Sequence, residues 1–180
     1  QAGSVDQSDA VSSARVAQAS FERRRLRCLP VSLSSSGGDC DEIIGRICTT
    51  YSEGEWYPVP EDDEIVRMRV RLLERLDSMQ TLAPQSDWIL GQRVWYRVEG
   101  GDAAGALTVS TECGGAHAWW CDALRGFALQ TLGDYGASLT AFESALEGMD
   151  ADQAEEWRVP RWSVDSKGRG LLDDLEEDRK

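Results

Sequence analysis

Residues 118–148 read AWWCDALRGFALQTLGDYGASLTAFESALEG, and this stretch decides the fold. Apolar residues recur at helical spacing in both halves. In the first half they are Leu124, Phe127, Ala128 and Leu132, and in the second they are Tyr135, Leu139, Phe142, Ala145 and Leu146. Between the halves, Gly133 provides the left-handed position that ends a helix, and Asp134 can cap the next one. We predict two antiparallel helices whose apolar faces meet.

The same stretch resembles the tetratricopeptide repeat family, which is built from stacked helical hairpins. The residues at matching spacing are Gly126, Gly133, Asp134, Tyr135, Leu139, Phe142, Ala145 and Leu146. Three positions depart from the family pattern: Asp122 stands where Trp is favoured, Ser138 replaces a small Ala, and Asp150 takes the place of a Pro. The resemblance implies a scaffold that binds other proteins.

A second hairpin is predicted directly before this one. Ser86 or Asp87 caps a helix over 88–98, a Gly-rich turn follows, and another helix runs over 102–113. The pair Gly101–Asp102 repeats the pair Gly133–Asp134 at an offset of 32 residues, close to the ~34 residues of tetratricopeptide arrays. We therefore predict an all-α, tetratricopeptide-like array of two to three hairpins with irregular arms at both ends.

Two further helical patterns would supply the third hairpin. Asp39 or Asp41 would cap a helix that carries Ile43, Ile44, Ile47, Cys48 and Tyr51. The other helix covers 62–82 and has the longest amphipathic pattern of the chain. Its arginines are expected on the solvent side; they are Arg67, Arg69, Arg71 and Arg75.

These patterns divide the chain into three parts. Residues 1–38 form an N-terminal arm with a helix over 10–28 and a Ser/Gly-rich loop. Residues 39–149 form the helical domain. Helical periodicity is lost after Gly148, so residues 150–180 are expected to form an extended arm with an acidic tail.

The charge of the chain constrains its partners. It has 19 Lys and Arg against 32 Asp and Glu, a formal net charge of −13. Nucleic-acid binding needs clustered cations, so we expect no nucleic acid among the partners. An acidic surface suits a basic protein partner, although it can also serve solubility alone. The cationic exception is Arg23, Arg24, Arg25 and Arg27, which either pair within the fold or dock on an anionic surface.

The five cysteines favour disulfides over a metal site. No CxxC spacing occurs and His117 is the only histidine, so neither a metal nor a cofactor is expected. The strongest pair is Cys113 with Cys121, because a turn between two helices brings their Cα atoms within reach. Cys40 pairs with Cys48 if it precedes the helix and folds back; otherwise Cys28 takes one of the two. Five reduced, buried cysteines remain the alternative.

Localisation is predicted from the same features. No apolar run approaches the ~20 residues that span a bilayer. The chain opens with Gln1 and small residues, as it would after signal-peptide removal, although a trimmed chain would begin in the same way. Together with disulfides, this predicts a periplasmic or other extracytoplasmic setting.

The sequence carries no recognised catalytic motif: no nucleophile elbow, phosphate loop, dinucleotide fingerprint or HExxH occurs. We predict a non-enzymatic protein-binding scaffold. Aromatic side chains are the expected partner anchors, namely Trp56, Tyr57, Trp157 and Trp162. By analogy, such a protein is similar to an extrinsic accessory subunit of a larger bacterial complex, such as a membrane-embedded respiratory or photosynthetic electron-transfer assembly. A peptide-binding adaptor, or an enzyme with a carboxylate site, is the alternative.

Overall fold

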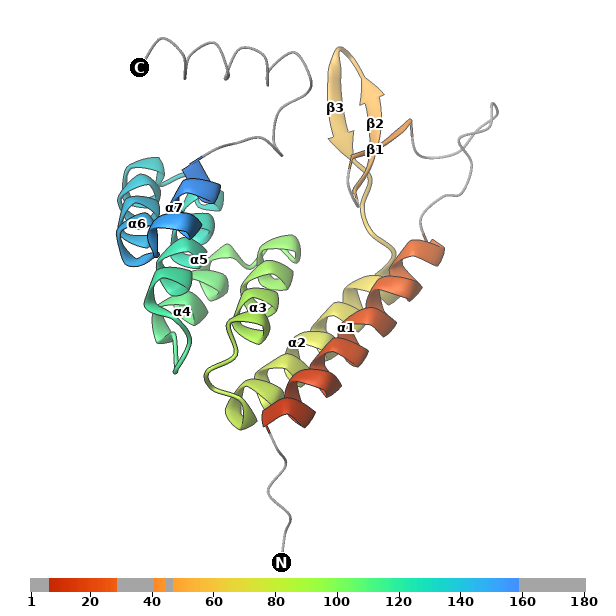
Figure 1. Ribbon diagram of the computed structural model, residues 1–180. Coiled ribbons are helices and arrows are strands. Elements are labelled where there is room, and N and C mark those ends of the chain that lie inside the picture. The colour runs from red at the N-terminus through yellow and green to blue at the C-terminus, as the bar shows by residue number, and fades with distance from the viewer. Residues whose placement is uncertain (1–6, 29–40, 45–46, 159–180) are drawn as a thin grey trace, which may run out of the picture.

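The computed structural model describes residues 7–28, 41–44 and 47–158 of the chain (Figure 1). Helices dominate this part, so the predicted all-α class is confirmed, with one small sheet added. The helices are α1 (Gln7–Cys28), α2 (Asp63–Leu82), α3 (Asp87–Glu99), α4 (Ala103–Glu112), α5 (Ala118–Thr131), α6 (Tyr135–Gly148) and α7 (Ala151–Arg158). The strands are β1 (Glu42–Ile44), β2 (Ile47–Ser52) and β3 (Glu55–Pro58), paired antiparallel in the order β1-β2-β3.

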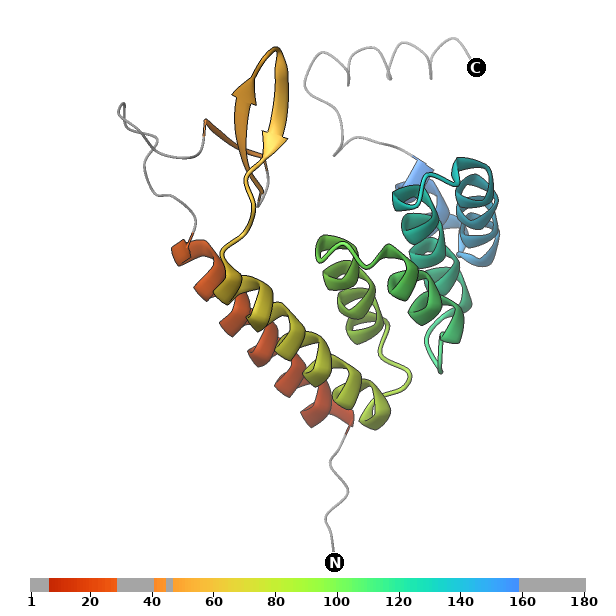
Figure 2. The same ribbon diagram turned by 180° about the vertical axis from the view of Figure 1, so that it is seen from behind.

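Consecutive helices pack as three hairpins: α1 with α2, α3 with α4, and α5 with α6. Each hairpin also packs on the next, through α2 with α3 and through α4 with α5. Both views show α1 and α2 as one long pair and α4–α7 gathered on the other side of α3 (Figures 1 and 2). Two buried clusters follow this division, one around α1–α3 and the other around α3–α5.

The turns of the second and third hairpins have the same construction. Gly101 and Gly133 adopt left-handed backbone angles, with φ of 82° and 81°. Asp102 accepts a hydrogen bond from the backbone N–H three residues later at 2.9 Å, and Asp134 does so at 3.1 Å. The backbone N–H of each aspartate donates to the carbonyl five residues earlier, at 2.8 and 3.0 Å. The repeat offset of 32 residues therefore corresponds to a repeated structure.

Small residues let α5 and α6 approach closely. Gly126 lies against Phe142, and a Cβ at position 126 would fall 2.9 Å from that ring. The hydroxyl of Ser138 donates to the carbonyl of Gly126 at 2.8 Å in a buried position. Ala141 and Ala145 complete the buried face of α6. The contact therefore combines small residues, which let the helices approach, with the ring of Phe142, which fills the space at Gly126.

Our prediction that Tyr135 and Leu139 face the core is wrong. Their exposed fractions are 71% and 60%. The reason is geometric: Ser138, Ala141 and Ala145 occupy the side of α6 that meets α5, so Tyr135 and Leu139 point away from it.

The helix predicted through Ile43, Ile47, Cys48 and Tyr51 does not form, and the segment forms β1 and β2 instead. Isoleucines and threonines dominate it, and β-branched side chains favour strands. Glu53 and Gly54 then form a two-residue loop with φ of 53° and 91°, which is the geometry that a tight β-hairpin requires. The third hairpin therefore cannot come from this segment.

α1 supplies the missing partner of α2. The prediction of a helix over 10–28 is confirmed, but α1 is part of the packed array and not of an arm, because Ala10, Ala14 and Phe21 are buried with residues of α2 and α3. The ring of Phe21 meets Tyr96 edge-on at 5.4 Å. The region 29–62 is thus a long connection within the first hairpin.

Two further predictions need correction. Arg69 is 4% exposed and not solvated, unlike the other arginines of α2. Residues 151–158 form α7, where we predicted an extended arm. The helix is short and largely polar, and it buries only Ala154, so its sequence lacks a clear apolar stripe.

The predicted disulfide between Cys113 and Cys121 is present, with Cα atoms 5.7 Å apart. It closes the loop between α4 and α5, and this loop is bonded to the loop between α2 and α3. The N–H of Gly115 donates to the carbonyl of Pro84 at 3.0 Å, and the N–H of His117 donates to Asp87 at 2.9 Å. Cys48 is also disulfide-bonded. Cys40 and the side chain of Cys28 lie outside the described part of the chain.

The close approach of α5 and α6 predicts the effect of a single methyl group. Gly126→Ala should lower the free energy of unfolding by about 1–3 kcal/mol, because the added Cβ would overlap the ring of Phe142. The matched control is Gly136→Ala in α6, where the nearest atom is 4.0 Å away. That variant should be neutral or more stable by up to about 1 kcal/mol. Urea unfolding monitored by circular dichroism measures both, and equal effects would contradict the packing described.

The double variant Cys113→Ala/Cys121→Ala tests the contribution of the disulfide. Without reductant, its free energy of unfolding should be lower than that of the wild-type protein by roughly 2–3 kcal/mol, because the short loop is no longer constrained in the unfolded chain. Thermal unfolding measures this loss. In reductant, the wild-type protein and the variant should unfold at similar temperatures. A difference that persists after reduction would assign the effect to lost side-chain packing instead.

Candidate protein-binding surface

The β2–β3 hairpin presents three exposed aromatic side chains. Tyr51, Trp56 and Tyr57 are 55%, 47% and 45% exposed. Tyr51 and Trp56 face each other across the two strands, with ring centroids 5.1 Å apart. Tyr57 is the neighbour of Trp56 along β3, so its side chain projects from the opposite face of the hairpin. Large aromatic side chains are thus exposed on both faces of the hairpin.

These rings are exposed because the hairpin stands apart from the helices. Both views place β2 and β3 beyond the ends of α1 and α2 and away from α3–α7 (Figures 1 and 2). Every residue of β3 is exposed. Among the residues of β2 whose burial is described, Cys48 and Thr49 are buried, near the base of the hairpin, whereas residues 51–58 toward and beyond the tip are exposed.

Hydrogen bonds fix the first strand of the sheet to the second. The carboxylate of Asp41 accepts from the N–H of Tyr51 at 2.7 Å, and the N–H of Asp41 donates to the carbonyl of Thr49 at 2.8 Å. The hydroxyl of Thr49 donates to the carbonyl of Glu42 at 3.0 Å. These bonds order the strand that carries Tyr51, which reduces the entropy lost when a partner binds.

A buried ionic cluster holds the chain where it returns from the sheet to α2. Glu61 accepts from Arg69, and one of its oxygens lies 3.1 Å from a guanidinium nitrogen of Arg25. Arg25 also donates to Glu99 at 2.8 Å. The cluster thus joins α1, α2, α3 and the connection from β3. Both arginines have side chains at most 6% exposed, so charge pairing is needed to keep them there.

The predicted arginine cluster divides into different roles. Arg25 is committed to this ionic cluster and cannot meet a partner. Arg24 is bonded to Glu64 through two nitrogens at 2.9–3.2 Å. Arg23 is exposed, and its Nε donates to the carbonyl of Ala19 at 3.2 Å. Among these three, Arg23 is the one without an ion pair to a described residue, and the side chain of Arg27 lies outside the described part of the chain.

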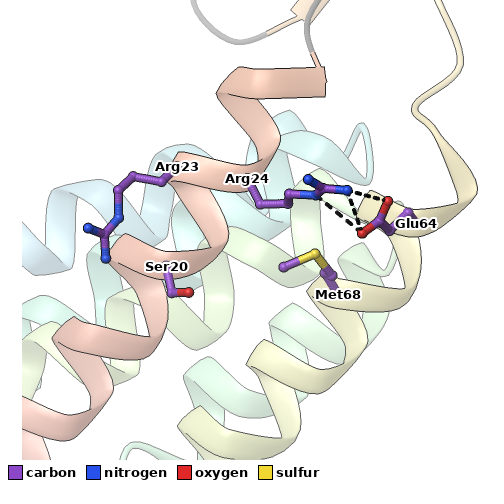
Figure 3. A pocket seen from close by; sticks show the side chains of 5 residues that line it. All are labelled: Ser20, Arg23, Arg24, Glu64 and Met68. Carbon is purple, nitrogen blue, oxygen red and sulfur yellow. Dashed lines mark hydrogen bonds and ion pairs between the residues drawn. The ribbon is translucent and has the colours of Figure 1, made fainter.

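A shallow cleft of about 370 Å³ lies between α1 and α2, beside these arginines. It is lined by Ser20, Arg23, Arg24, Glu64 and Met68. Figure 3 shows Arg24 turned toward Glu64, while the side chain of Arg23 extends in the opposite direction from that of Arg24. The Arg24–Glu64 pair neutralises its own charge, so the cleft offers a small polar surface and not a strong anion site.

The tryptophans of the last predicted arm are only partly described. Trp157 lies in α7 and meets Trp119 and Trp120 edge-on, with centroids 5.9 and 6.3 Å apart. It packs on its own helical array and is still 45% exposed. Trp162 lies outside the described residues. Trp157 therefore has a structural role that Trp56 lacks.

Sequence reasoning missed the exposure of Tyr51. We predicted a helix through this residue, and its β-branched neighbours were the signal that could have placed it on a strand. A further aromatic residue, Trp95, is 44% exposed. It stacks on Phe127 with centroids 5.7 Å apart, and its indole nitrogen donates to Glu99 at 2.9 Å.

His117 lies in the α4–α5 loop and serves to fix that loop. Its ring Nδ1 is 2.6 Å from a carboxylate oxygen of Asp87, and the carbonyl of Asp87 accepts from the indole of Trp120 at 2.8 Å. The two sulfurs nearest in sequence to His117, those of Cys113 and Cys121, are bonded to each other and are not available as nucleophiles. Within the described ranges, no group of three or more metal-ligating side chains is brought together.

None of the helices in the described part of the chain is both long enough and apolar enough to cross a bilayer. No family model, curated protein or solved structure matches the chain.

The ionic cluster gives a stability prediction with an internal control. Glu61→Ala should lower the free energy of unfolding by about 3 kcal/mol, because it leaves the buried guanidinium of Arg69 without its carboxylate. Glu64→Ala removes the partner of Arg24 instead, in a pair that is nearly half exposed, and should cost at most about 1 kcal/mol. Chemical unfolding measures both variants. Losses of equal size would show that the cluster around Glu61 is not what anchors the start of α2.

Proposed function

We propose that this protein is a non-enzymatic protein-binding scaffold whose β2–β3 hairpin anchors the partner. The observation that carries the proposal is the exposure of Tyr51, Trp56 and Tyr57 on a hairpin that no described helix covers. Tyr and Trp are the residues that dominate binding energy at the centres of protein interfaces. Three exposed aromatic side chains on one short hairpin are unusual for a surface that contacts only water.

The helical array supports the hairpin. Its stacked hairpins with equivalent glycine–aspartate turns, together with the sequence resemblance, favour a tetratricopeptide-like array. Such arrays hold binding residues on a rigid frame. The ionic cluster around Glu61 fixes one end of the sheet to three helices, so the aromatic side chains are positioned before a partner arrives.

The electrostatic field of the chain favours a basic partner. The net charge of −13 would attract a cationic surface and speed its approach. Glu53 lies in the hairpin turn and Glu55 directly follows it, and both are exposed. A partner that places apolar groups on the aromatic rings and lysines or arginines around them fits this surface.

The proposed setting is extracytoplasmic. The Cys113–Cys121 disulfide supports an oxidising compartment, such as a bacterial periplasm. In that setting we propose an accessory subunit that attaches to a larger complex, of which a membrane-embedded electron-transfer or photosynthetic assembly is one example. The hairpin would be the attachment point.

Site-specific photo-crosslinking in the native source tests the proposal. A photo-reactive residue at position 56 should crosslink to one protein, and the same residue at the exposed position 108 on α4 should not. With that partner in hand, Trp56→Ala should weaken binding about 30-fold or more, which corresponds to about 2 kcal/mol. Trp157→Ala serves as the comparison at an aromatic residue packed on its own fold. Unchanged affinity in the Trp56 variant would reject the hairpin as the anchor.

A further inference from the structure

α6 has two apolar faces, and the described residues bury only one of them. Ser138, Ala141 and Ala145 are buried against α5. Tyr135 and Leu139 lie one helical turn apart on the outer face and are 71% and 60% exposed. We call Tyr135 and Leu139, with the exposed Glu143 and Glu147 that continue the same row, the α6 row. Large apolar side chains with such exposure mark an interaction surface.

The repeat shows what such a row does elsewhere in the same molecule. At the offset of 32 residues, Tyr135 corresponds to Ala103 and Leu139 to Leu107. Ala103 is 8% exposed, and Leu107 packs on a cluster that includes Leu124 of α5. In the second hairpin these positions are therefore packed within the stacked helices. In the third hairpin the equivalent positions face outward, and a further helix packed on α6 would cover the α6 row in a comparable way.

The same chain carries a helix face with complementary chemistry. Val66 and Val70 lie one turn apart on the outside of α2 and are 44% and 53% exposed. Beside them run Arg67, Arg71 and Arg75, all exposed. None of these three arginines makes a hydrogen bond or an ion pair with any described residue. We call these five residues the α2 row; it combines apolar groups with unpaired cations in an otherwise acidic chain.

We propose that two copies of this chain associate head to tail, with the α6 row of one copy packed on the α2 row of the next. Tyr135 and Leu139 would meet Val66 and Val70, and Glu143 and Glu147 would meet the arginines. Pairing at contact outweighs repulsion between the two acidic bodies, because salt screens charges beyond about 8 Å at physiological ionic strength. The two surfaces differ, so each copy keeps one free row, and association is open-ended.

The inference does not depend on the proposed function, because the β2–β3 hairpin takes no part in it. A cationic amphipathic helix from another protein would be the other occupant of the α6 row. Self-association of the purified chain distinguishes these two occupants, because a purified sample contains second copies of this chain and no other protein.

Analytical ultracentrifugation of the full chain, at about 0.15 M salt and from about 1 µM to about 500 µM, is the test. The wild-type protein should form dimers and larger species as its concentration rises. Leu139→Glu and Arg71→Glu should each remain monomeric over the same range, while Thr108→Glu, on the exposed side of α4, should behave as wild type. All of the substituted side chains are exposed, and unchanged circular dichroism would verify that the variants fold.

Mixing the two inactive variants tests the direction of association. Leu139→Glu keeps its α2 row and Arg71→Glu keeps its α6 row, so a mixture should form a dimer with one of each and stop there. A wild-type protein that stays monomeric throughout would overturn the proposal. So would association that survives Arg71→Glu, or a mixture that forms no dimer.

Discussion

The close approach of α5 and α6 is the constraint on which the rest of the array depends. At Gly126 the absence of a side chain lets the ring of Phe142 lie against the backbone, and Ser138 bonds to the carbonyl exposed there. Small residues at this crossing make the buried face of α6 narrow. Tyr135 and Leu139 lie outside this face, so the helix that closes the hairpin also carries an exposed apolar row.

Two other groups of contacts keep the hairpins together. The Cys113–Cys121 disulfide and the bonds to Pro84 and Asp87 join the loops at one end of the second and third hairpins. The buried cluster around Glu61 joins the first two hairpins and the sheet. The contacts between the loops include a covalent bond, whereas the cluster around Glu61 depends on paired charges. The fold therefore couples its stability both to redox conditions and to a few ionic contacts.

The surface separates two kinds of aromatic residue. Trp157 is exposed in part but packs on Trp119 and Trp120, so its place is explained by the fold. Tyr51 and Trp56 contact mainly each other, on a hairpin that projects from the helices. Only the second kind lacks a structural reason, which is why the proposed attachment point lies on the sheet and not on the helical array.

The sequence alone predicted the hairpins that have strong local signals, which are the caps at Ser86 and Asp134, the glycines at left-handed turns, and the 32-residue repeat that relates Gly101–Asp102 to Gly133–Asp134. It also located the pair Cys113–Cys121, because a short turn brings those residues together. The rest depended on tertiary contacts. A run of β-branched residues whose spacing also fits a helix forms β1 and β2, because β-branched side chains favour strands and neighbouring strands are there to pair with it. Contacts between segments far apart in the chain determine which helix packs on α2. They also determine that Arg25 and Arg69 are buried and that Tyr135 and Leu139 are exposed. The sequence shows which residues are apolar or charged and how they are spaced. Only the packing of the helices shows which of these residues are buried.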